Sequence, residues 1–135
     1  MKEITLDATI DNIETVTEFV NGQLDECGCP LKAQMQIDIA IDELFGNIAH
    51  YAYRSGVGPA TVRVEALANP AAVMVTFIDH GVPYNPLEKE DPDVTLSAGE
   101  REAGGLGIFL VKKSMDGIMY EYKNGQNILR IRKNI

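Results

Sequence analysis

The chain has 135 residues, which fits one domain of ordinary size, so we expect a single domain over residues 1–135. Apolar residues make up 45% of it and charged residues 24%, a composition typical of globular rather than disordered chains. The formal charge of −8 disfavours direct binding of nucleic acid, because phosphates must be neutralised by Lys and Arg.

The sequence indicates neither a membrane segment nor an exported protein. It has no apolar run of the roughly 20 residues that cross a bilayer, and its N-terminal residues lack the pattern of a signal peptide. We therefore expect a cytoplasmic location and no membrane contact. Cys27 and Cys29 form neither a C-x-x-C motif nor a disulfide framework, so we expect two reduced thiols.

The N-terminal third predicts a strand and two helices. Residues 2–8 alternate as a short strand does, and residues 12–27 follow helical spacing. Asp11 and Glu14 form a pattern typical of a capped helix start. After Gly28, a second helix is expected from Pro30 to about Tyr53.

The remainder predicts a sheet interrupted by one long polar segment. Alternation predicts a strand at residues 62–66, and the nearly continuous apolar run 73–78 indicates a central strand. Residues 86–103 lack periodicity, and we interpret them as a lid loop, at about 86–103. The last expected elements are a helix at 106–115 and two strands, 118–123 and 127–133, joined by the hairpin signal Asn124-Gly125. This order predicts an α/β fold of the α+β kind. It is a two-layer sandwich with a mostly antiparallel or mixed sheet and three helices on one face.

The second helix carries the first candidate site. Glu43, Asn47 and His50 are spaced i, i+4 and i+7, which places them on one helical face. A solvated helix face explains this spacing about as well as a binding site does. Gly46 costs a helix roughly 1 kcal/mol relative to Ala, which suggests close approach by a ligand or another element.

Two further stretches carry polar residues or glycines that packing of the core does not require. Asp79-His80-Gly81 follows the expected central strand, where a carboxylate could accept a hydrogen bond from an exocyclic amine; a simple turn is the alternative. Gly104-Gly105-Leu106-Gly107 opens the third helix, where free N–H groups and the helix dipole favour a phosphate. The pattern is neither a P-loop nor the dinucleotide fingerprint.

In order and spacing, these three stretches resemble the N, G1 and G2 boxes of the GHKL (Bergerat-fold) ATP-binding superfamily. Within it, the chain is most similar to the stand-alone bacterial anti-sigma-factor serine/threonine kinases. The resemblance covers nearly the whole chain. Pro83 stands where the wider superfamily often has a second glycine, a form that the anti-sigma-like branch tolerates.

The resemblance implies ATP and Mg²⁺ as cofactors and a role for each matching residue. Glu43 would be the general base, and Asn47 would ligate Mg²⁺. Asp79 would accept the adenine amino group, with Gly81 giving room for the ring. Four residues would contact the phosphates: Gly104, Gly105, Leu106 and Gly107. Arg101, in the lid, would supply positive charge to the γ-phosphate. The role of His50 is open, since it either orients the pocket or caps a helix end.

The resemblance also implies a function and partners. The chain would phosphorylate a serine of a STAS-domain anti-sigma-factor antagonist, hold a sigma factor, and form a homodimer. A nucleotide-gated binding module that transfers no phosphate is the alternative, and the intact Glu43 favours the kinase. A free-standing small-molecule ATPase ranks last, because the sequence shows no further substrate pocket.

Overall fold

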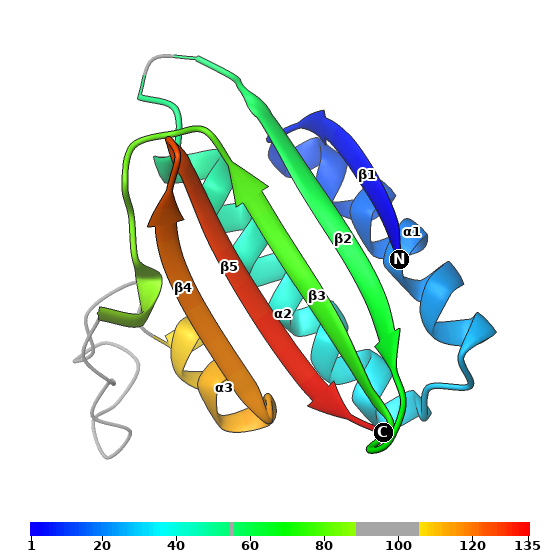
Figure 1. The fold of residues 1–135 in the computed structure, drawn as a ribbon. Helices are drawn as coiled ribbons and strands as arrows, with labels where there is room; N and C mark the ends of the chain where they lie inside the picture. Colours follow the sequence, from blue (N-terminus) through cyan, green and yellow to red (C-terminus); the bar gives the residue numbers. More distant parts are fainter. Residues whose placement is uncertain (55, 89–105) are drawn as a thin grey trace.

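The computed structural model describes residues 1–54, 56–88 and 106–135. In these ranges, the strands form one sheet in the order β1-β2-β3-β5-β4, and each neighbouring pair is antiparallel. The strands are β1 (Lys2–Asp7), β2 (Pro59–Leu67), β3 (Ala72–Asp79), β4 (Gly117–Lys123) and β5 (Gln126–Asn134). The helices α1 (Ile13–Glu26), α2 (Leu31–Tyr51) and α3 (Leu106–Ser114) cover one face of this sheet (Figure 1). The predicted two-layer α+β fold is confirmed.

The core lies between the sheet and the three helices. β3 is the middle strand, as its apolar run predicts, and all but one of its residues are buried. The largest fully buried side chains come from both layers and include Phe45 and Ile41 of α2, Phe77 of β3 and Ile108 of α3. No helix in the described ranges is long and apolar enough to cross a membrane.

The boundaries of the elements agree with the sequence to within a few residues, with one local correction. Asp11 does not cap α1, because Ile10–Asn12 forms a short 3-10 helix, η1, and α1 then begins at Ile13. The residue at the cap is Asn12, whose side chain accepts no hydrogen bond from the helix; its Nδ2 donates to the carbonyl of Asp7 over 2.7 Å. The side chain there ties β1 to the helical layer.

The predicted hairpin and the reduced thiols are confirmed. Asn124 and Gly125 have φ values of 54° and 76°, the left-handed pair that a two-residue hairpin turn requires. Cys27 and Cys29 are both free. Residues 86–88 form a second 3-10 helix, η2 (Pro86–Glu88). The remainder of the predicted lid, residues 89–103, lies outside the described residues, so the lid stays a prediction. The assignment of a single domain also stays a prediction.

The sheet register brings two polar residues together at one end of the core. Asp79 is the last residue of β3 and lies directly opposite Asn127, near the start of β5. α2 passes behind this end of the sheet (Figure 1). The site is therefore built where β3, β5 and α2 meet.

Candidate functional site

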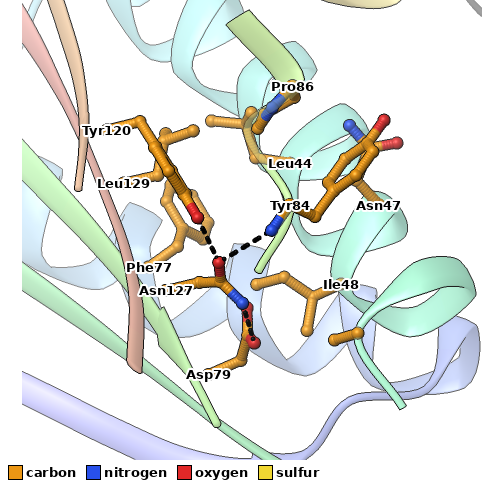
Figure 2. A pocket seen from close by; sticks show the side chains of 11 residues that line it. Leu44, Asn47, Ile48, Phe77, Asp79, Tyr84, Pro86, Tyr120, Asn127 and Leu129 are labelled. Carbon is orange, nitrogen blue, oxygen red and sulfur yellow. Dashed lines mark hydrogen bonds between the residues drawn. The ribbon is translucent and has the colours of Figure 1, made fainter. Parts of the chain in front are cut away.

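A small cavity of about 30 Å³ lies between α2 and the ends of the central strands. Its walls come from α2, β3, β4, β5 and the segment after β3 (Figure 2). They include two sequence candidates, Asn47 and Asp79, and four residues that carry a further polar group or close the cavity: Tyr84, Pro86, Tyr120 and Asn127. A space of this size takes no more than a few water molecules.

Asp79 is the buried charged group of this cavity, with 4% of its surface exposed. Its Oδ1 accepts two hydrogen bonds, from the backbone N–H of Gly81 at 2.8 Å and from Nδ2 of Asn127 at 2.9 Å. Burial raises the pKa of Asp79, and these two hydrogen bonds partly oppose that rise. Both described bonds fall on Oδ1, which leaves Oδ2 as the oxygen with acceptor capacity for a ligand.

Asn127 uses its full hydrogen-bonding capacity inside the protein. Its Nδ2 donates to Asp79 and, over 2.8 Å, to the carbonyl of Val82. Its Oδ1 accepts from the backbone N–H of Tyr84 at 3.0 Å and from the hydroxyl of Tyr120 (Figure 2). A side-chain amide has two donors and two acceptor positions, so all four are satisfied.

The sequence reasoning missed Asn127 as a site residue, although one signal was present. Asn127, Leu129 and Ile131 alternate along β5, so Asn127 occupies a position that faces the core. A buried amide is almost always hydrogen-bonded, and this one marks a polar network. Tyr84 and Tyr120 were missed as well, because their contacts depend on the sheet register.

The loop after β3 is held against the end of α2. A Cβ on Gly81 would collide with the backbone carbonyl of Ala52, and the N–H of Val82 donates to the same carbonyl over 2.9 Å. Glycine is therefore required at position 81 by backbone packing. Room for a ring, the role expected from the resemblance, stays a prediction.

Glu43 and Gly107 make a second close approach, between α2 and the first turn of α3. A Cβ on Gly107 would overlap the carboxylate of Glu43. The side chain of Glu43 thus reaches the positive end of the α3 dipole, where a negative charge is favoured. Leu106, which begins α3, is exposed.

The structure corrects the interpretation of Gly46. Gly46 is buried, but apart from its chain neighbours and the nearby backbone of α2, no atom of the described residues lies within 4 Å of a Cβ built on it. Among the described glycines, the close approaches occur at Gly58, Gly81 and Gly107 instead. The ligand alternative for Gly46 stays a prediction.

The other candidates are only partly placed. Asn47 lines the cavity, whereas His50 lies further along α2 and is exposed, with its ring centroid 6.0 Å from that of Tyr51. Arg101, Gly104 and Gly105 lie outside the described residues. Neither alternative for His50 is tested by these contacts.

The donor set suits a cation that is held mainly by its ligand. Among the described residues, no group of three or more His, Cys, Asp or Glu could hold a metal ion. Asn47 offers one amide oxygen at the cavity wall. Mg²⁺ commonly takes one or two protein oxygens together with substrate phosphates and water, so this sparse set fits it.

Comparisons with known proteins give the family of the chain and two of its relatives. The family model for the histidine kinase-like ATPase domain matches residues 6–133. The chain is 25% identical over 131 residues to the serine-protein kinase RsbW of Bacillus mycoides, an alignment that covers 94% of this chain and 81% of the relative. It is 24% identical over 100 residues to the serine/threonine-protein kinase BtrW of Bordetella bronchiseptica, covering 74% of this chain and 70% of the relative.

Proposed function

The chain belongs to the histidine kinase-like ATPase domain family, whose members bind ATP, and on this premise we propose that it is an ATP-dependent protein serine/threonine kinase. Its substrate is a serine of a STAS-domain anti-sigma-factor antagonist, and the same chain, as a cytoplasmic homodimer, sequesters a sigma factor. The names of the relatives RsbW and BtrW support the kinase activity. The observation that carries the proposal is the packing of Glu43 against Gly107, at the first turn of α3.

The nucleotide would lie along α2, with its base and its phosphates at different elements. Asp79 is the acceptor for the adenine amino group, because Oδ2 lacks a described hydrogen bond while Oδ1 is held in place. The cavity is too small for a purine, so binding of the base requires its walls to move apart.

The phosphates would lie at the start of α3. Gly107 brings a backbone N–H there without a side chain, and Gly104 and Gly105 complete the glycine-rich entry proposed from the sequence. Asn47 supplies an oxygen to Mg²⁺, which when bound neutralises charge on the phosphates. Arg101 contributes positive charge to the γ-phosphate.

The transfer step needs a base near the phosphate end, and Glu43 provides it. The serine hydroxyl of the partner forms a bond to the γ-phosphorus, while the bond from that phosphorus to the β–γ bridging oxygen breaks. Glu43 accepts the hydroxyl proton, and ADP leaves with the bridging oxygen. Positioning and charge neutralisation supply most of the rate in such transfers.

The experiment compares the wild-type chain with Glu43→Gln, using Mg·ATP and a STAS-domain protein encoded in the same genome. We expect ATP affinity to be retained, and phosphate incorporation to fall by about 10²–10⁴-fold, the typical contribution of a general base. Glu18→Gln, the same change at an exposed position of α1, is the matched control.

Two outcomes would count against the proposal. Transfer at the wild-type rate by Glu43→Gln would remove Glu43 from the role of base. ATP binding by the wild-type chain with no phosphate transfer to the antagonist would favour the nucleotide-gated binding module. The Ser→Ala variant of the antagonist is the negative control for transfer.

A further inference from the structure

The backbone that follows Asp79 is fixed by hydrogen bonds at three consecutive amides. The N–H of His80 donates to the hydroxyl of Tyr53 over 3.0 Å, and that of Gly81 donates to Asp79 over 2.8 Å. The N–H of Val82 donates to the carbonyl of Ala52 over 2.9 Å. Two of the three acceptors therefore belong to consecutive residues at the end of α2.

Tyr53 is itself held in one orientation. Its hydroxyl donates to the carbonyl of Pro59 over 2.6 Å, which uses its one proton and directs a lone pair to His80. Its ring packs so closely on Gly58 that a Cβ there would collide with it. A tyrosine hydroxyl is protonated at neutral pH, and burial raises the pKa of Tyr53 further above 10.

This arrangement connects the two ends of the candidate site. α2 carries Glu43 and Asn47, and the segment directly after its last turn holds the loop on which the orientation of Asp79 depends. A shift of His80 away from Tyr53 would move Gly81 and, with it, the donor that fixes Oδ1. Asn127 and the sheet register hold the strand side of the carboxylate, and the residues at positions 52 and 53 connect its loop to α2.

We propose that Tyr53 is a positioning residue for the nucleotide, which holds the Asp79 carboxylate in register with Asn47 and Glu43 on α2. It acts through the His80 amide and does not itself touch the ligand. The inference rests on the proposed ATP site. It adds a residue that neither the sequence motifs nor the walls of the cavity identify.

The test is Tyr53→Phe, which keeps the ring against Gly58 and removes the hydroxyl. Calorimetry would measure the affinity for ATP and for purine riboside triphosphate, which lacks the 6-amino group. We expect ATP to bind about fivefold more weakly, as the loss of about one hydrogen bond implies, and the analogue to change less than about twofold. A purely structural role would weaken both ligands equally.

A second measurement follows the loop without any ligand. Amide hydrogen exchange at His80 should be faster in Tyr53→Phe than in the wild-type chain, because its acceptor is gone. Tyr122→Phe is the matched control, since Tyr122 is 44% exposed and its hydroxyl has no hydrogen bond among the described residues. The control should leave both affinities and the exchange at His80 unchanged.

The outcomes separate this inference from the proposed function. If the wild-type chain binds ATP and Tyr53→Phe binds ATP and the analogue as the wild type does, the inference is wrong and the proposed function stands. Equal weakening of the two ligands would also overturn it. If the wild-type chain does not bind ATP, both the proposed function and the inference are wrong.

Discussion

Asn127 donates from Nδ2 to Oδ1 of Asp79 over 2.9 Å, between residues that lie directly opposite each other on β5 and β3. The same Nδ2 donates to Val82, so one amide holds both the carboxylate and the loop that follows it. Because the sheet register sets the position of both residues, this contact is part of the fold. The acidic group of the site is therefore built into the end of the core.

Replacing Asn127 by Ala should destabilise the chain. The change removes four hydrogen bonds and leaves the N–H of Tyr84 and the hydroxyl of Tyr120 without their partner. Unsatisfied buried groups cost about 1–3 kcal/mol, so we expect the free energy of unfolding in urea to fall by about 2–3 kcal/mol. Asn134→Ala, an exposed change at the other end of β5, should cost far less; equal losses would contradict the prediction.

Asp79→Asn should separate stability from ligand binding. Since burial raises the pKa of Asp79 above 3.8, the folded chain binds this proton more tightly than the unfolded chain does. Its contribution to the free energy of unfolding is therefore most favourable below the unfolded pKa, and it is lost as pH rises through the folded pKa. The variant lacks this ionisation and keeps an acceptor oxygen for Gly81 and Asn127.

The expected result is a stability difference that changes with pH. From about pH 4 to about pH 7, the free energy of unfolding of Asp79→Asn should increase relative to that of the wild-type chain. ATP affinity should fall by about 10–100-fold, because the bond to a charged acceptor is lost. If the free energies of unfolding of the variant and the wild-type chain changed in parallel with pH, burial would not raise the pKa of Asp79. An unchanged affinity for ATP would show that Asp79 does not bind the adenine base.

The sequence predicted the layers well and the polar network poorly, for physical reasons. Alternation and helical spacing are local, so β3, α2 and the Asn124-Gly125 hairpin follow from neighbouring residues. The pairing of Asp79 with Asn127 depends on the register of strands that are distant in sequence, which local patterns do not encode. The glycines illustrate the same limit. Helix propensity drew attention to Gly46, but the positions where a side chain would collide are Gly81 and Gly107, and the colliding atoms come from residues distant in sequence.

Gly107→Ala should impair phosphate transfer while leaving the fold intact. The added Cβ would overlap the Glu43 carboxylate, which is the end of a flexible side chain and must shift to make room. We expect the free energy of unfolding to change by less than about 1 kcal/mol, and transfer to fall by about 10²-fold, as misplacement of a reacting group by about 1 Å does. Stability is read from urea unfolding, and transfer from phosphate incorporation into the antagonist.

The control for this change is Gly46→Ala, at a buried helical position where no described atom beyond its chain neighbours and the nearby α2 backbone lies within 4 Å of the added Cβ. It should stabilise the chain by up to about 1 kcal/mol through helix propensity and leave transfer unchanged. Lost transfer in the control would indicate that a ligand approaches Gly46 after all. Full activity of Gly107→Ala would separate Glu43 from the phosphate end of the site.

Asn47→Ala should weaken the binding of Mg·ATP more than that of metal-free ATP. Asn47 lines the cavity on the same face of α2 as Glu43, and its amide oxygen is the ligand proposed for Mg²⁺. Titrating ATP with and without Mg²⁺ measures this difference in each variant. We expect about a tenfold loss of affinity with Mg²⁺ and less than about a threefold loss in excess chelator, as the removal of one charge-assisted contact implies. Asn47→Asp keeps an oxygen at that position and should retain the dependence on Mg²⁺, whereas equal losses with and without the metal would show that Asn47 binds the nucleotide directly.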